Sequence, residues 1–114
     1  LPEFKIQETI QNIISAQGVS FNDFINILIL APIIEELYFR KILMMHLQKT
    51  IGSFWAIFLS SMLFSAVHFN IISSPTLFTL GIYLGLIYLL TNNLISCVII
   101  HVIFNSTMLL FIVN

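Results

Sequence analysis

The apolar residues of this chain fall into blocks whose spacing predicts helices throughout. In residues 1–19 they recur mostly on one helical face, between charged and amide side chains, so we expect an amphipathic helix lying on a membrane surface. Longer apolar runs follow over 24–47, 54–72, 76–91 and 94–113. Each run is near the ~20 residues that a helix needs to cross about 30 Å of hydrocarbon.

Turn-forming residues separate these runs. They occur at 52–53, 70–75 and 92–93, and such short connections make successive helices antiparallel. The predicted fold is therefore all-α. We expect a polytopic membrane helical bundle of about four transmembrane helices over residues 20–114, preceded by one amphipathic interfacial helix over 1–19.

Two glycines stand one helical turn apart in the third run. Gly81 and Gly85 form a Gly-x-x-x-Gly pair, whose missing side chains let another helix approach closely. We interpret this pair as a packing feature.

The composition agrees with a membrane protein. The chain is 59% hydrophobic and 8% charged, with a mean hydropathy of +1.05, which excludes an ordinary soluble domain. No Asp, Glu, Lys or Arg occurs from Thr50 to Asn114, so we expect membrane lipid as the solvent. A net charge of -1 leaves no basic surface for nucleic acid. Because the chain begins at Leu1 without a signal-peptide pattern, we expect a fragment of a larger membrane protein.

A few polar residues lie inside the predicted spans. A charge at a helix centre costs about 2.5–3.5 kcal/mol on insertion, so function is the default explanation for such residues. They are Glu35, Glu36 and Arg40 in the first run, His68 in the second, and His101 and Asn105 in the fourth.

Helical spacing suggests which of these side chains pair with each other and which stay available for chemistry. Glu36 and Arg40 are four residues apart and can pair. Glu35 points ~140° away from Arg40 and is left free. A free glutamate among apolar groups, with an imidazole nearby, can hold and deprotonate a water. His101 and Asn105, one turn apart, can donate hydrogen bonds to an oxygen on which negative charge develops. Together these groups favour amide hydrolysis.

The same residues resemble the motifs of a known family. In order, 35–40 (Glu-Glu-Leu-Tyr-Phe-Arg), 64–68 (Phe-Ser-Ala-Val-His) and 101–105 (His-Val-Ile-Phe-Asn) resemble the Glu-Glu-x-x-x-Arg, Phe-x-x-x-His and His-x-x-x-Asn motifs of the CPBP family. That family groups type II CAAX prenyl proteases with bacteriocin-processing and immunity (Abi) proteins. The resemblance covers about residues 31–105.

The resemblance implies an intramembrane endopeptidase and assigns roles. Glu35 and His68 would activate water, and His101 and Asn105 would form the oxyanion site. It favours a mechanism without a cofactor. The family has also been called metalloproteases, and zinc held by Glu35, His68 and His101 is the alternative. None of these residues has the His-Glu-x-x-His spacing of a known zinc site.

The remaining motif residues, Glu36, Arg40 and Phe64, would be structural or assisting. The implied partners are membrane lipid, a peptide or lipidated protein substrate, and transmembrane helices of the parent chain, since family members have more spans than this chain offers. The implied setting is a bacterial cell membrane, in bacteriocin processing or self-immunity.

Two other functions compete with this interpretation, and two other protease chemistries have less support. The same ionisable residues could relay protons or ions in a transporter. A catalytically idle member could bind a toxic peptide as an immunity protein. Ser65, one turn before His68, could suggest a serine nucleophile, but small residues in membrane helices usually serve packing, and no Gly-x-Ser-x-Gly turn is present. An aspartyl protease needs two aspartates, and Asp23 is the only one here.

Overall fold

A computed structural model describes residues 8, 12, 15–16 and 20–113 of the chain. The expected interfacial helix over 1–19 falls almost entirely outside these residues and stays a prediction. Within the described part of the chain every regular element is a helix and no strand occurs, which confirms the all-α class.

The first helix is one long run with a change of winding in its middle. It comprises α2 (Phe21–Glu36), the π-helix η1 (Leu37–Met44) and α3 (Met45–Ile51). Ser20 caps its start by accepting a hydrogen bond from the Asp23 backbone N–H at 3.1 Å. The wider π winding begins directly after Glu36 and was not predicted from the sequence. π segments are rare and are found frequently at functional sites.

The other helices are α4 (Ser53–Ala66), α5 (Ser74–Thr91) and α6 (Leu94–Val113). The prediction that the second run is helical to residue 72 is wrong, because the helix ends at Ala66. The chain then turns, and Phe69 adopts a left-handed φ of 52° that a right-handed helix cannot contain. His68 therefore lies in the turn between α4 and α5, not on a spanning helix.

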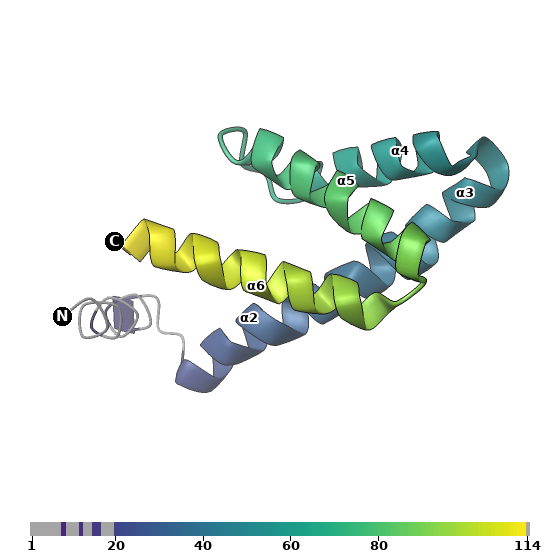
Figure 1. The fold of residues 1–114 in the computed structure, drawn as a ribbon. Helices are drawn as coiled ribbons and strands as arrows, with labels where there is room; N and C mark the ends of the chain where they lie inside the picture. Colours follow the sequence, from purple (N-terminus) through teal and green to yellow (C-terminus); the bar gives the residue numbers. More distant parts are fainter. Residues whose placement is uncertain (1–7, 9–11, 13–14, 17–19, 114) are drawn as a thin grey trace.

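The helices pair in two sets. In Figure 1, α6 runs beside the first helix, and α4 and α5 form a hairpin whose two members pack mainly on each other. A Cβ atom at Gly81 would lie 3.0 Å from Ser61 Cβ, and one at Gly85 would lie 3.2 Å from Met44 Sδ. The two glycines thus admit α4 and η1 to the surface of α5, and the packing interpretation is confirmed.

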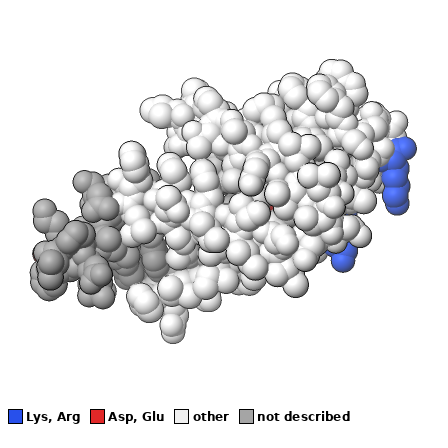
Figure 2. Space-filling model, viewed as in Figure 1, with Lys and Arg blue, Asp and Glu red and all other residues white. Residues whose placement is uncertain are grey.

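A membrane setting fits two helices by length and composition. Among the described residues, α5 and α6 are long and apolar enough to span a bilayer. The 14 residues of α4 extend over only about 21 Å. Spanning by α4 and by the first helix therefore stays a prediction. The face drawn in Figure 2 is nearly uncharged, and its visible cationic atoms gather at the end where α3 lies.

The buried apolar core lies where η1, α4, α5 and α6 meet. Several polar side chains are buried with it, and these define the site described next. The core residues are Phe39, Met44, Ala56, Ile57, Phe64, Leu80, Leu84, Tyr88 and Cys97.

Candidate active site

A charged cluster forms at the point where α2 gives way to η1. Glu36 lies between two partners: its Oε1 is 3.0 Å from Arg40 Nε, and its Oε2 is 2.8 Å from His101 Nδ1 on α6. The predicted pairing of Glu36 with Arg40 is confirmed. All three side chains are at most 1% exposed, so the cluster holds its charges away from solvent.

Glu35 joins this cluster from its more open side. Its Oε2 lies 3.4 Å from His101 Nε2, and 31% of the Glu35 side chain is exposed. As predicted, Arg40 pairs with Glu36 and not with Glu35 among the described residues, and the imidazole near Glu35 is that of His101, which reaches both carboxylates. A neutral imidazole carries one N–H and can donate to only one of them. The cluster thus runs from Glu35, which is partly exposed, through His101 and Glu36 to Arg40, which is fully buried.

Phe64 stands at the centre of the surrounding side chains. The Arg40 guanidinium lies over its ring at 5.1 Å from the centroid, a cation–π arrangement. Edge-to-face contacts join the same ring to His68 at 5.1 Å, His101 at 5.5 Å and Phe39 at 5.4 Å. Phe64 therefore fixes the spacing between the two histidines, which supports the structural role expected of it.

The buried Arg40 guanidinium makes no hydrogen bond to any described residue. Its Nε lies 3.0 Å from Glu36 Oε1 as an ion pair, and none of its three nitrogens has a hydrogen-bond acceptor among the described residues. The attraction of the two charges and the Phe64 ring therefore hold this side chain.

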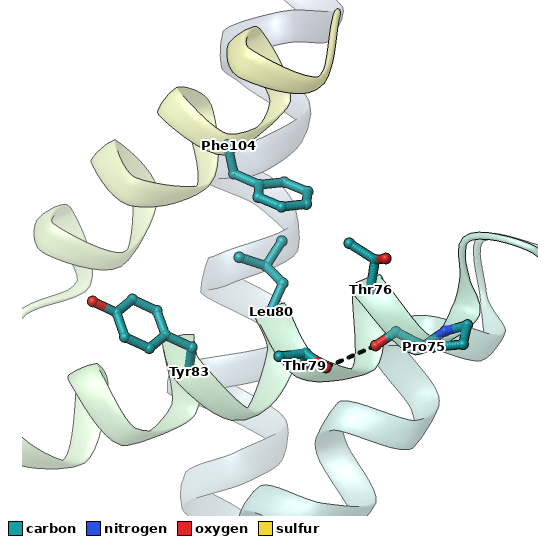
Figure 3. Close-up of a pocket in the computed structure, with 6 residues that line it drawn as sticks. All are labelled: Pro75, Thr76, Thr79, Leu80, Tyr83 and Phe104. Carbon is teal, nitrogen blue, oxygen red and sulfur yellow. Dashed lines mark hydrogen bonds between the residues drawn. The ribbon is translucent and has the colours of Figure 1, made fainter. Parts of the chain in front are cut away.

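His68 faces a different neighbourhood. Its Nδ1 is 2.7 Å from the Phe64 carbonyl oxygen; because a carbonyl only accepts, Nδ1 carries the proton in this contact. His68 and Asn105 line the same pocket of about 440 Å³ between the α4–α5 turn and α6. Thr76 and Phe104 line both this pocket and a neighbouring one of about 550 Å³ on α5. Figure 3 shows the neighbouring pocket, with Phe104 of α6 facing the α5 side chains.

The site residues are thus paired differently from the roles that the resemblance implies. Glu35 contacts His101, while His68 shares a pocket with Asn105. In the described residues no hydrogen bond or ion pair joins Glu35 to His68, and none joins His101 to Asn105.

This arrangement also bears on the zinc alternative. No three His, Cys, Asp or Glu side chains of the described residues converge in a way that could hold a metal ion. His68 and His101 each contact the Phe64 ring, and only His101 contacts Glu35. The three proposed ligands do not fit a zinc site in this geometry.

Sequence reasoning missed how the His68 turn is closed. The Ser65 hydroxyl lies 2.7 Å from Ser74 Oγ and donates to the Ser74 carbonyl oxygen at 2.9 Å. These bonds tie the end of α4 to the start of α5. Ser65 therefore has a structural partner and no hydrogen bond to His68 among the described residues, which gives no support to a serine nucleophile. The position of Ser65 in the sequence, between Phe64 and His68, was the only sign of this role.

Fold and site together define a helical membrane protein with a buried carboxylate–histidine–arginine array beside an open pocket. The model of the type II CAAX prenyl endopeptidase Rce1-like family matches residues 18–107. The chain belongs to this family, within the CPBP group. No curated protein and no solved structure matches the chain.

Proposed function

We propose that this protein is an intramembrane endopeptidase that hydrolyses a peptide bond with a glutamate-activated water, without a metal. Family membership suggests an intramembrane protease in general. The observation that carries the finer proposal is the position of Glu35: it is a partly exposed carboxylate that contacts a buried imidazole, while the other end of that imidazole is held by Glu36.

The proposed reaction uses the two parts of the site in turn. Glu35 takes a proton from a water, and the water oxygen forms a bond to the carbonyl carbon of the substrate. Hydrogen-bond donors on the pocket wall, the Asn105 amide first among them, stabilise the negative charge on the carbonyl oxygen. The C–N bond then breaks, and the departing amine takes up the proton.

The pocket surroundings support an apolar substrate. Beside His68 and Asn105, the neighbouring pocket on α5 is lined mostly by apolar and aromatic side chains. We propose a lipidated protein tail or a membrane-associated peptide as the substrate, and processing of a bacteriocin or self-immunity in a bacterial cell membrane as the setting. The substrate's peptide bond would lie at the His68 turn, and its apolar group would lie along α5.

The test is cleavage of a synthetic farnesylated peptide ending in a CAAX sequence, by the protein reconstituted in lipid vesicles. We expect mass spectrometry to detect the released tripeptide with the wild type and not with Glu35→Gln, which keeps the shape and removes the base. His46→Gln, an exposed histidine on α3, is the matched control and should cleave normally. Equal products from wild type and Glu35→Gln would refute the mechanism.

A second arm addresses the non-enzymatic alternative. If neither protein cleaves any added peptide, while both protect cells from a toxic peptide equally well, the proposal of an enzyme fails and a binding role in immunity replaces it.

A further inference from the structure

The histidine in the α4–α5 turn is held by a carbonyl that a regular helix would use otherwise. In a continuing α-helix the backbone N–H of His68 would bond to the Phe64 carbonyl, four residues back. Here that N–H bonds to the Ser65 carbonyl at 3.3 Å, three residues back. The Phe64 carbonyl oxygen accepts instead from Nδ1 of the His68 ring at 2.7 Å. The end of the helix thus supplies the acceptor that orients the imidazole.

A left-handed residue directly after the histidine belongs to this helix ending. Phe69 has a φ of 52°, a conformation that residues with a Cβ atom rarely adopt, because that atom crowds the following carbonyl oxygen. Helices that end with a left-handed residue usually have Gly or Asn there. The Phe69 side chain is 93% exposed, so packing around its ring does not offset the cost of this backbone.

Hydrogen bonds on both sides hold the strained residue in place. The N–H of Phe69 bonds to the Ala66 carbonyl of α4 at 3.1 Å. Further along the chain, the Ser74 carbonyl accepts from the Ser65 hydroxyl at 2.9 Å, which ties the start of α5 to the end of α4. Strained backbone persists only where the surrounding structure determines it, and it is concentrated at functional sites. The conformation of Phe69 therefore calls for a functional explanation.

The consequence for His68 is a fixed tautomer. Because Nδ1 donates its proton to the Phe64 carbonyl, a neutral ring has no proton on Nε2. Nε2 has no hydrogen bond to any described residue, and the ring lines the same pocket as Asn105. His68 therefore offers the pocket a lone pair, which can accept a hydrogen from water. The water-activating role that the resemblance implies for His68 needs such an acceptor.

We propose that Phe69 is a positioning residue: its left-handed backbone ends α4, leaves the Phe64 carbonyl to the imidazole and so keeps the Nε2 lone pair of His68 available to the attacking water. The inference rests on the proposed hydrolysis and deepens it, because it names what orients His68. The backbone of Phe69 carries this role, and its ring does not. Glycine, which adopts positive φ at no steric cost, should therefore replace Phe69, whereas a β-branched residue should not.

The test reads the tautomer of His68 directly, independently of turnover. The protein is labelled with ¹⁵N-histidine in lipid micelles at about pH 8, where an exposed imidazole is neutral, and the signals are assigned with His46→Gln and His68→Gln. We expect a protonated Nδ1 and an unprotonated Nε2 at His68. Phe69→Gly should keep this pattern, whereas Phe69→Val should shift it toward that of the exposed His46. Ile71→Val, at an exposed position of the same turn without a positive φ, is the matched control and should change nothing.

Kinetics on the farnesylated peptide supply the second readout. Loss of one hydrogen bond to a carbonyl shifts a conformational equilibrium by about 2–10-fold. Phe69→Val should therefore lower kcat by about that factor with little change in KM, and glycine at the same position should restore it. A merely structural role of Phe69 would not link kcat to the tautomer of His68.

Three results would overturn the proposal. They are a protonated Nε2 at His68 in the wild type, a tautomer that changes in Phe69→Gly, and a tautomer and kcat that Phe69→Val leaves as they are. If Phe69→Val does not fold, the first two results still decide. If the wild type shows the expected His68 pattern but releases no tripeptide, the proposed hydrolysis fails, and the positioning role of Phe69 in that reaction fails with it.

Discussion

Replacing Arg40 by methionine tests the buried charge array most directly. Arg40→Met keeps an apolar stem of similar length against the Phe64 ring and removes only the guanidinium. Because no described residue accepts from the two terminal nitrogens, the change breaks no hydrogen bond to them. The main loss is the attraction between Arg40 and Glu36, whose side chains are both 0% exposed.

The size of this loss follows from the geometry. Two unit charges about 4 Å apart attract by about 4 kcal/mol at an effective dielectric constant near 20. Removing one partner of a buried ion pair costs about 3–5 kcal/mol in measured cases. His101 remains 2.8 Å from Glu36 and still contacts the carboxylate that Arg40 no longer pairs with. We therefore expect a loss of stability at the lower end of this range, about 3 kcal/mol.

The measurement is the free energy of unfolding in mixed micelles with rising dodecyl sulfate, followed by helical circular dichroism. Lys41→Met is the matched control, since Lys41 is an exposed cation on the same π-helix, and it should change stability by less than about 0.5 kcal/mol. Glu36→Gln combined with Arg40→Met should recover stability to within about 1 kcal/mol of wild type, because no unpaired charge is left.

Two results would refute the reasoning. Equal stability of Arg40→Met and Lys41→Met would mean that Arg40 does not balance Glu36. A double variant less stable than Arg40→Met alone would mean that the two side chains stabilise the fold by other contacts. If Arg40→Met does not fold, recovery of folding in the double variant still decides between these cases.

The remaining predictions concern packing and the metal. Gly81→Ala should lower the free energy of unfolding by about 1–3 kcal/mol in the same titration, because its Cβ would lie 3.1 Å from the backbone of Ser61; an unchanged stability would contradict that close approach. Cys97 is fully buried and should react with a maleimide only after denaturation, so rapid labelling of the native protein would show that α6 is packed otherwise. Ser65→Ala should destabilise the α4–α5 turn by about 1 kcal/mol through loss of the bonds to Ser74, measured by thermal unfolding, with Ser65→Thr closer to wild type. Cleavage of the farnesylated peptide should persist in a zinc chelator; loss of cleavage, restored by added zinc, would bring back Glu35 as a metal ligand.

The helical class and the polar residues proposed for the site could be predicted from the sequence. Long apolar runs require helices because backbone groups in lipid must be satisfied within the segment, and this holds whatever the neighbours are. The spacing of Glu36 and Arg40 likewise predicted a contact that forms within one helix. The cost of intramembrane charge singled out the polar residues as functional candidates before any helix was placed.

The pairing across helices was decided only in three dimensions. Which carboxylate meets His101 depends on the rotation of α6 against the first helix and on the π winding after Glu36, and a linear pattern encodes neither. The end of α4 at Ala66 was equally hidden, because residues 67–72 are as apolar as those of many helices. The sequence by itself thus determined the helical class and the candidate residues for the site. The tertiary structure decided that Glu35 lies against His101, and that His68 lies in a turn beside Asn105, because these contacts depend on how separate helices are rotated and joined.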